Sequence, residues 1–485
     1  MRISIYRKNK TPLFLQIKNQ IKEMIVNGEL IHGFILPSER ELAKKLDVHR
    51  NTIIRAYQEL KADGLINSTK GQYYSVTYEV FYNQGTMRGK KSRIPWEHLT
   101  NQDVSHLNDQ LFHESTIPKG ISFQGVIPSP DVYPKEEIRE IFTELINSKE
   151  IDIFSYCSSQ GVAVLRSNIA KLLRDRQITA TPNEIHIVLE TSQVLDYLTK
   201  ILINPGDGII VEEPVGPDVY RYLRFRGAKI ITIPMDEQGM MTDCLEKLIL
   251  KYHPKLIYTF PTFHNPTGTV MSLDRRYQLL DCSYQYNIPI IEEDWFFDLR
   301  YEGTPIPPLK ALDKHKHVIY LDSFAMTFAP GMTFGYVVAP QPIIEKFHSL
   351  TAFSLIFVNS LNQYLMSAFI EKGLYEKKIR GLCRYYAEKR DLICTELERA
   401  KDLGISYVKP AGGFYVWCRL PDHVNQNALL ITAAKMGINF LPGFVFFPHG
   451  TKGENYIRLC FSYPSLEQIK QGIGLLLQAI SACAQ

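Results

Sequence analysis

The chain has 485 residues, of which 45% are hydrophobic and 22% charged, and it includes 25 Phe and 27 Tyr. This profile is typical of a folded globular protein and excludes intrinsic disorder for most of the chain. At roughly 100–200 residues per domain, the length predicts about three domains. No apolar run reaches the roughly 18 residues that a membrane span needs, and no apolar segment follows the charged start MRISIYRKNK. We therefore expect a cytoplasmic protein without a membrane partner.

The eight cysteines lie between positions 157 and 483. None belongs to a C-x-x-C pair, and no histidine tract accompanies them. A disulfide framework or a zinc site is therefore not expected, and no metal site is predicted. Reduced thiols that pack as small apolar side chains are the predicted state.

The positive charge is concentrated near the N-terminus. Residues 1–80 hold 13 Lys and Arg against 8 Asp and Glu, which leaves 42 against 43 in the rest of the chain. A small basic module on a near-neutral body suggests a polyanion partner for that module alone. A solvated basic surface would carry the same charge, so the interpretation depends on the motifs.

Three helical patterns and a hairpin pattern follow one another in the first eighty residues. Apolar residues at helical spacing predict a helix over residues 11–27. A second helix begins after Ser38, because Ser38 and Glu41 have the spacing of a capping box. A third is predicted over residues 50–63, and alternation around a Lys70-Gly71 turn predicts a β-hairpin. This order is that of a winged helix-turn-helix.

The third predicted helix carries polar side chains at its N-terminal end, namely Arg50, Asn51, Thr52 and Arg55. Such side chains suit phosphate oxygens and base edges. A generic helical domain with a charged face is the alternative, but it does not require a cap, a turn, a basic helix and a wing in this order. We therefore predict that the module binds double-stranded DNA.

The segments PLFLQIKNQIKEMIVNGEL and LPSERELAKKLDVHRNTIIRAYQELKADGLI resemble the N-terminal domain of the GntR family of bacterial transcription regulators. The interface expected with this resemblance comprises Ser38, Arg40, Arg50, Asn51, Thr52, Arg55, Lys70 and Gly71. Gly71 would lie at the tip of the wing. His49 stands where the family usually has Ser, a difference that bears on one phosphate contact.

Residues 79–115 show no clear periodicity and include the basic stretch NQGTMRGKKSRIPW. This composition predicts an interdomain tether, which could also touch the DNA backbone. The predicted organisation is therefore a winged helix-turn-helix over 1–78, a linker over 79–115 and a large body over 116–485.

In the large body, short apolar runs rich in β-branched residues alternate with helical segments. The runs are IHIVLE, GIIVEEP, KIITIPM, KLIYTFP, IPIIEED, HVIYLDSF and FGYVVAP. The alternation predicts an α/β fold with a mostly parallel central sheet covered by helices. Neither a Gly-rich Rossmann turn nor a Walker A motif occurs, so nothing points to nucleotide binding.

Several phrases of this body resemble fold-type I aminotransferases that use pyridoxal phosphate (PLP), and they occur in that family's order. They are GVAVLR at 161–166, PGD at 205–207, HNPTG at 264–268, IIEED at 290–294, SFAMTFAPGMTFGY at 323–336, PAGGFYVW at 410–417 and YIRLCFS at 456–462. With the N-terminal module, the whole chain resembles the MocR/GabR subgroup of GntR regulators. The resemblance implies a fold-type I PLP-transferase-like domain that senses an effector, PLP as the family cofactor, and a homodimer.

The resemblance places Met326 at the position of the lysine that holds PLP as a Schiff base. A thioether has no amine, so covalent PLP binding is not expected. Lys310, Lys314 and Lys316 precede the strand and are not convincing substitutes.

Other positions of the family pocket are also changed. The resemblance places Thr333 at the phosphate-binding Arg, Glu190 at the Gly of the phosphate cup, and Gly216 at the aromatic residue that stacks on the cofactor ring. It places Glu293 at the acidic residue beside the pyridine nitrogen, and Trp295 at the Tyr near the ring hydroxyl. Thr191 and Ser192 could still donate hydrogen bonds. So many departures in one pocket indicate that selection for PLP has lapsed or changed.

Three family positions are retained. The resemblance implies that Asn265 contacts the cofactor's ring oxygen, that Ser323 binds its phosphate, and that Arg458 grips a substrate carboxylate. For Asn265 and Ser323 the alternative is fold maintenance, because N-P-T-G also makes a turn. For Arg458 the alternative is an ion pair with a surface carboxylate.

The predicted function is a bacterial DNA-binding transcription regulator, associated with the nucleoid when bound to its operator. Its aminotransferase-like domain senses a small molecule, for which a carboxylate is the candidate class, or dimerises, without transaminase catalysis and with no catalytic residue. Two alternatives stay open: a working PLP-dependent aminotransferase, and a regulator that binds PLP noncovalently.

Overall fold

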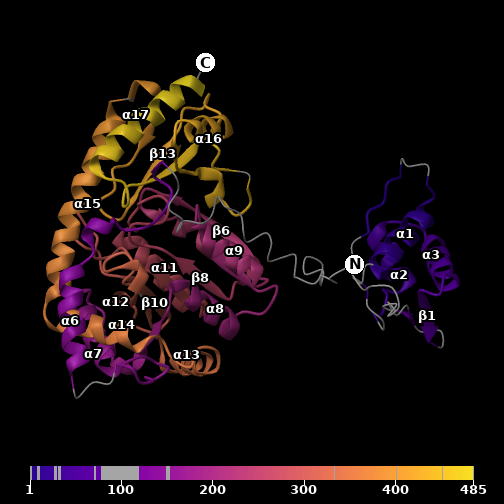
Figure 1. Cartoon of the computed structure of the whole chain (residues 1–485), viewed down its shortest axis with the longest axis horizontal. Coiled ribbons are helices and arrows are strands. Elements are labelled where there is room, and N and C mark those ends of the chain that lie inside the picture. Colours follow the sequence, from indigo (N-terminus) through magenta and orange to yellow (C-terminus); the bar gives the residue numbers. More distant parts are fainter. Residues whose placement is uncertain are drawn as a thin grey trace, which may run out of the picture. The chain divides into compact units, whose positions relative to one another are not determined.

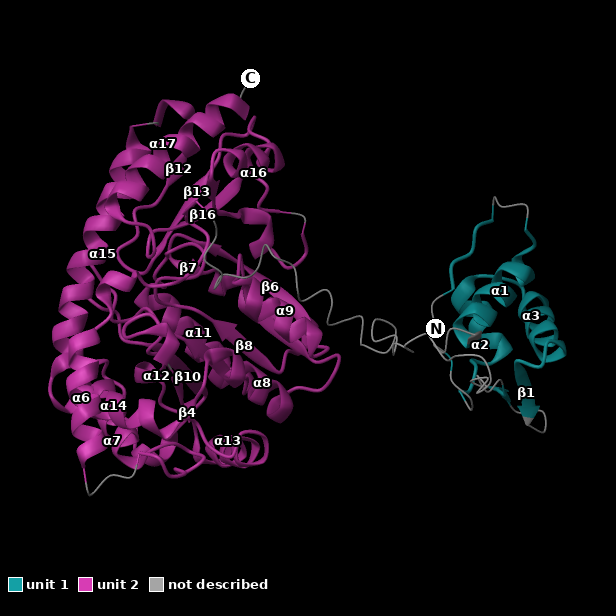
Figure 2. Ribbon diagram, in the orientation of Figure 1, with its two compact units in different colours: residues 1–106 teal, residues 107–485 magenta. Residues whose placement is uncertain are grey.

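The structure is a computed structural model that describes residues 3–7, 11–26, 30, 34–69, 73–77, 120–148, 153–332, 334–399, 401–450 and 452–483. It divides into two compact units, residues 1–106 and 107–485 (Figure 2). The predicted linker, 79–115, lies outside the described residues, as do both of its predicted boundaries.

In its described residues, the first unit contains three helices and a two-stranded antiparallel sheet, which confirms the predicted winged helix-turn-helix. Its elements are α1 (Leu13–Val26), α2 (Glu39–Leu46), α3 (Arg50–Ala62), β1 (Ile66–Thr69) and β2 (Tyr73–Val76). Ile17 and Ile21 of α1 pack in one core with Ile53 and Leu60 of α3. All four side chains are fully buried, which is what helical spacing of apolar residues predicts.

The ends of α2 and α3 follow from local sequence. The Ser38 side chain accepts a hydrogen bond from the backbone N–H of Glu41, and the Glu41 side chain accepts one from the backbone N–H of Ser38. This capping box satisfies two N–H groups that the first turn of a helix leaves unpaired. Asp47 ends α2 in the left-handed conformation, and His49 caps α3 by accepting from the backbone N–H of Asn51. The turn between the two helices is therefore short.

The second unit is built on an eight-stranded mixed sheet. Its order is β4-β11-β10-β9-β8-β5-β6-β7. The strands are β4 (Ile185–Val188), β5 (Gly208–Glu213), β6 (Lys229–Asp236), β7 (Gly239–Met240), β8 (Leu256–Thr259), β9 (Ile290–Glu293), β10 (Val318–Ser323) and β11 (Gly335–Val338). The central strands β10, β9, β8, β5 and β6 are parallel, whereas β11 and β7 are antiparallel to their neighbours. The prediction of a mostly parallel sheet is confirmed.

Helices cover both faces of this sheet. On one face, α8 (Thr191–Leu202), α9 (Pro217–Phe225) and α13 (Gln341–Ser354) pack on Ile319 and Leu321 of β10. The opposite face carries α7 (Ala163–Asp175), α10 (Leu245–Tyr252), α11 (Leu273–Tyr286), α12 (Leu309–Leu312) and α14 (Ser360–Glu371), with α6 (Lys135–Asn147) beside them. Val318 and Tyr320 point to that opposite face. Because successive residues of a strand alternate in direction, Ser323 and Asp322 also belong to opposite faces.

A smaller antiparallel sheet follows in the order β12-β13-β16-β15. Its strands are β12 (Ser406–Tyr407), β13 (Tyr415–Arg419), β15 (Leu441–Pro442) and β16 (Tyr456–Cys460), and β3 (Ile121–Ser122) pairs separately with β14 (Ile438–Asn439). Helices α15 (Leu374–Glu398), α16 (Gln426–Lys435) and α17 (Leu466–Cys483) share its core. Figure 1 shows the long α15 running from the helices of the large sheet to those of the small one. In the described part of the chain, no helix is long and apolar enough to cross a membrane.

Candidate functional site

The predicted DNA-facing residues lie at the start of α2 and along α3 of the first unit. Arg40, Arg50, Asn51 and Arg55 are exposed, and Thr52 is half-buried. Ser38 is exposed too, but its hydroxyl is engaged in the capping box. Lys70 and Gly71, the predicted wing tip, lie outside the described residues.

Two of these arginines are held by neighbours within the unit. The Nη2 atom of Arg50 lies 2.8 Å from Oε2 of Glu39 in α2, and both side chains are partly solvent-accessible. The guanidinium of Arg55 lies over the ring of Phe14, with Cζ 3.9 Å from the ring centroid. The ion pair and the stacking hold both guanidinium groups against neighbours on the surface of the unit. A face of α3 that presents two ordered cations can receive a phosphate backbone.

The second candidate site lies where the parallel strands β8, β9 and β10 end, the edge at which open α/β sheets bind ligands. Glu293 ends β9 and is buried, and its Oε2 accepts a hydrogen bond from the Tyr258 hydroxyl of β8. Burial raises the pKa of Glu293 to about 8, while a hydrogen bond from Thr191 opposes the shift and the charges of Asp218 and Glu190 add to it. A protonated Glu293 at neutral pH is a hydrogen-bond donor as well as an acceptor.

Glu190 and Thr191 begin helix α8 on the same face of the sheet. Glu190 is the N-cap residue, and its side chain makes no capping hydrogen bond. Glu190 is exposed, yet desolvation by the surrounding protein raises the pKa of its carboxyl group. A hydrogen bond with the backbone of Thr191 lowers that pKa, but by less. Ser192, also in the first turn, is exposed. This helix start carries a carboxylate where the resemblance requires a glycine that leaves room for phosphate.

Met326 and Ser323 lie in the turn that follows β10. Met326 is 8% exposed and packs in an apolar cluster with Phe260, Phe263 and Phe296. The Ser323 hydroxyl accepts a hydrogen bond from the backbone N–H of Ala325, so it stabilises this turn. Met326 therefore fills its place as a core side chain.

No lysine can take the place of Met326 from the segment before β10. The Nζ atom of Lys310 donates to the carbonyl of Val318, the first residue of β10, at 2.6 Å. Lys314 and Lys316 also precede that end of the strand. Six residues of strand span roughly 17 Å, which separates these amines from the turn at the other end. Lys310 is mostly buried, and burial lowers its pKa.

Arg458 of β16 is fully buried and joins the small sheet to the loop after β8. Its Nη1 donates to Oδ1 of Asn265 at 2.9 Å, and its Nη2 donates to the carbonyl of Gln124 at 2.6 Å. The guanidinium also lies over the rings of Tyr415 and Phe446, at 4.5 Å and 5.1 Å from Cζ to the centroids. The Cβ of a side chain at Gly216 would meet Nδ2 of Asn265 at 3.4 Å, so Gly216 lies beside the same amide. The structure thus brings Arg458, Asn265 and Gly216 together.

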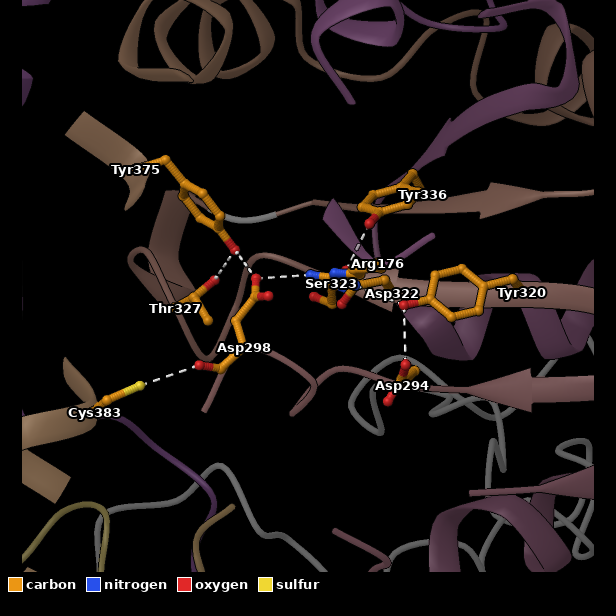
Figure 3. Close-up of polar contacts among 10 residues, drawn as sticks. All are labelled: Arg176, Asp294, Asp298, Tyr320, Asp322, Ser323, Thr327, Tyr336, Tyr375 and Cys383. Carbon is orange, nitrogen blue, oxygen red and sulfur yellow. Dashed lines mark hydrogen bonds and ion pairs between the residues drawn. The ribbon is translucent and has the colours of Figure 1, made fainter. Parts of the chain in front are cut away.

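A buried polar network supports the Met326 turn from the opposite face of β10 (Figure 3). Arg176 lies 2.7 Å from both Asp298 and Asp322, and Asp322 accepts a hydrogen bond from Tyr336 at 2.6 Å. Burial alone would lower the pKa of Arg176, but the charges of these carboxylates hold it above its usual value. Tyr375 donates to Asp298 at 2.8 Å, and its hydroxyl oxygen lies 3.3 Å from that of Thr327, which can donate to it. The network therefore fixes both sides of the turn, at Asp322 and at Thr327.

The residues of this pocket do not fit PLP held through a lysine. Met326 offers no amine, and its side chain is committed to the core. The carboxylate of Glu190 stands where α8 begins, and Gly216 provides no ring to stack on a pyridine. Thr333, at the position of the family's phosphate-binding Arg, lies outside the described residues.

Comparisons with known proteins agree with this architecture. The family model described as aminotransferase class I and II matches residues 129–476, and that of the bacterial regulatory proteins of the gntR family matches residues 13–74. The chain belongs to the aminotransferase class I and II family. Because a GntR-type helix-turn-helix domain precedes the aminotransferase-like domain, the architecture is that of the MocR-type regulators.

Some relatives share both domains, and others share only the aminotransferase part. The HTH-type transcriptional regulator YdfD of Bacillus subtilis is 29% identical over 98% of each chain. The probable rhizopine catabolism regulatory protein MocR of Rhizobium meliloti is 25% identical over 98% of this chain and 95% of its own. Aromatic-amino-acid aminotransferase 1 of Thermococcus litoralis is 32% identical over 74% of this chain and 88% of its own. The multiple substrate aminotransferase of Thermococcus profundus superposes with a TM-score of 0.75, at 29% identity, over 80% of this chain and 99% of its own.

Several residues of the pocket were not predicted from the sequence. Tyr258 reaches Glu293 because β8 and β9 are parallel neighbours, a pairing that no local signal encodes. Gln124 approaches Arg458 through its backbone carbonyl, for which side-chain type gives no signal. The sequence did offer a signal for the pairing of Asp322 with Arg176. Asp322 is an acidic residue in a strand predicted to be buried, and a buried carboxylate needs a charge partner.

Proposed function

We propose that this MocR-type protein binds a double-stranded DNA operator as a homodimer, and that its aminotransferase-like domain responds to a small molecule without transamination. One observation carries the proposal. The chain presents an exposed basic face on α3 of its GntR-type domain, whereas Met326 fills the place of the Schiff-base lysine. Operator binding implies that the protein works in the bacterial cytoplasm and on the nucleoid.

The DNA contact is proposed for the start of α2 and for α3. Arg40, Arg50 and Arg55 would neutralise phosphates, and Asn51 and Thr52 would reach base edges in the major groove. The wing residues Lys70 and Gly71 belong to the same proposal. Since helix-turn-helix dimers read paired half-sites, the operator would consist of two half-sites.

A second copy of the chain is the proposed occupant of an exposed apolar patch on the aminotransferase-like unit. The patch comprises Phe154 (81% exposed), Tyr156 (79%), Phe353 (92%) and Ile356 (62%). The Ser360 hydroxyl, at the start of α14, shares its single hydrogen between the carbonyls of Ile153 and Ser155, and so links the segment around Phe154 to the chain that follows Ile356. Large apolar side chains that are exposed close together mark interaction sites, whereas isolated ones are common on any protein surface. A homodimer would bury the same patch on both subunits.

The proposed effector is a carboxylate held near Arg458 and Asn265. Arg458 is buried, permanently charged and oriented by neutral oxygens and aromatic rings. A guanidinium in that setting favours a planar anion such as a carboxylate. Noncovalent binding of PLP would need a dianion beside the carboxylate of Glu190, which Coulomb repulsion opposes. An active aminotransferase is the weaker candidate, because Met326 supplies no amine.

To test the proposal, the full-length protein is used to select duplexes from a random DNA library, and its affinity for the selected duplexes is measured at several salt concentrations. We expect enrichment of paired half-sites and an affinity that falls steeply with salt, as phosphate contacts require. Selection of no sequence would refute the proposal. A parallel assay for amino transfer should show no activity above that of free PLP.

A further inference from the structure

A cleft of about 830 Å³ lies between the large and the small sheets of the aminotransferase-like unit. It is lined by the ends of β5 and β6, the segment after His264, the segment before β13, and parts of β13, β16 and the loop between Phe447 and Tyr456. This volume is within the range of small-molecule sites, which occur preferentially between domains. The cleft differs from the pocket around Glu293 and Met326, since neither residue lines it.

Flat aromatic side chains form one wall of the cleft. The rings of Trp417 and Tyr456 are stacked, with centroids 5.2 Å apart and planes 7° apart. Trp417 also meets Phe446 edge to face at 5.5 Å, and Phe447 continues the same wall. Val408 and Val270 add aliphatic surface to the lining. Stacked rings of this kind accept another flat ring, which adds dispersion and quadrupole attraction to apolar burial.

Four of the five charged side chains of the lining are paired with one another or with near neighbours, and the fifth, Glu237, adds a further carboxylate. Lys452 lies 2.6 Å from Glu213, and Lys409 lies 2.8 Å from Asp391. Asp236 lies 2.7 Å from Arg275. Binding of a phosphate would have to break one of the lysine pairs and face the remaining carboxylates, so the lining disfavours a dianion. A ligand without a phosphate meets no such cost.

We propose that this cleft between the two sheets is a second small-molecule site, which binds a flat aromatic compound that carries no phosphate. The site goes beyond the proposed function, because operator binding and the carboxylate pocket do not require it. The cleft is coupled to the proposed carboxylate pocket at Arg458 through two contacts. Trp417 is the register partner of Arg458 across β13 and β16, and Phe446 contacts both side chains. A ligand that moves Trp417 would therefore shift Arg458 as well.

The test uses indole as the probe and the full-length protein labelled with 5-fluorotryptophan. The chain has three tryptophans. Trp417 lines the cleft, Trp295 packs against Phe296 at the other pocket, and Trp96 lies outside the described residues. Trp417→Phe and Trp295→Phe assign their fluorine signals. We expect indole to shift the Trp417 signal saturably at concentrations that leave the Trp295 signal in place, and inorganic phosphate to leave both unchanged.

A matched pair of variants separates the cleft from other surfaces. Val408 is 64% exposed and lines the cleft, whereas Ile431 of α16 is 59% exposed and does not line it. Val408→Arg should weaken indole binding about tenfold, which corresponds to about 1.4 kcal/mol, and Ile431→Arg should leave it unchanged. Equal effects of the two variants, a shift that never saturates, or a response confined to Trp295 would overturn the proposal. The measurement contains no DNA, so its failure would leave operator binding standing.

Discussion

Arg50 of α3 and Glu39 of α2 form an ion pair, with Nη2 2.8 Å from Oε2. This contact joins the two helices of the helix-turn-helix at the surface proposed to face DNA. It holds the guanidinium at this surface, but it also places a carboxylate where a phosphate would bind. A phosphate must therefore compete with Glu39 for the same guanidinium.

Arg50→Ala should weaken operator binding by about 1–3 kcal/mol, because it removes a phosphate or base contact. Glu39→Gln should strengthen binding, since the competing charge is lost while the side-chain size is kept. Fluorescence anisotropy with a labelled operator measures both effects. Arg139→Ala, on an exposed helix of the other unit, is the control and should have no effect. Unchanged affinity in both Arg50→Ala and Arg55→Ala would refute the docking of α3.

Met326→Lys should not restore tight covalent PLP binding. The variant would still lack the phosphate-binding Arg at position 333 and the stacking ring at position 216, and it would retain Glu190. A lost charged hydrogen bond costs about 1.5–3 kcal/mol and lost ring stacking about 1 kcal/mol. Together they predict PLP binding weaker by roughly two to three powers of ten. Titration of PLP, followed by the visible absorption of the lysine adduct, measures the affinity, and stoichiometric binding would show that the pocket is still built for PLP.

The stability of the aminotransferase-like unit should depend on pH through Glu293. Because the pKa of Glu293 is raised from 4.5 to about 8 in the fold, the native state holds a proton that the unfolded chain releases above pH 4.5. The stability that the protonated Glu293 contributes is fully present below pH 4.5 and is lost as pH rises through about 8. Glu293→Gln keeps the size and cannot ionise, so its Tm relative to the parent should increase from pH 5 to pH 8.5. Glu140→Gln, at an exposed position, should show no such trend.

Arg176→Met should destabilise the same unit strongly, because it leaves Asp298 and Asp322 buried without their cation. Breaking a buried pair in this way costs about 3–5 kcal/mol. The double variant Arg176→Met with Asp322→Asn should lose less than the sum of the two single changes. Lys316→Met removes an exposed ion pair with Glu184 and should cost no more than about 1 kcal/mol. The midpoints of guanidinium unfolding compare the stability of the four variants with that of the parent protein. These variants are Arg176→Met, Asp322→Asn, the double variant and Lys316→Met.

Phe353→Asp should dissociate the proposed homodimer, since it places a charge at the most exposed residue of the apolar patch. Sedimentation of the full-length protein at micromolar concentration distinguishes dimer from monomer. Leu250→Asp changes a residue of similar character, 56% exposed on α10, and should leave the dimer intact. A parent protein that sediments as a monomer, with and without operator DNA, would contradict the dimer.

Local sequence determined the first unit and the strands of the second. The Ser38 and Glu41 capping box, the apolar spacing of α1 and α3 and the alternation of β1 and β2 are signals within a few residues of one another, and each produced the predicted element. The apolar runs of the large body became strands for the same reason, because a continuous β-branched run is stable only when both faces are buried. The sequence also carries the resemblance that places Met326 at the position of the Schiff-base lysine, and this placement stays a prediction.

Only the tertiary structure decided which side chains meet. Tyr258 reaches Glu293, Arg458 reaches Asn265, and Arg176 reaches Asp322 across separations of 35, 193 and 146 residues. The order of the strands in the sheet makes such contacts, and no local propensity encodes that order. Strand alternation alone places Ser323 and Asp322 on opposite faces of β10, but only the covering helices show which face each residue occupies. The cleft beside Trp417 arises from the packing of two sheets, so no single segment of the sequence could indicate it.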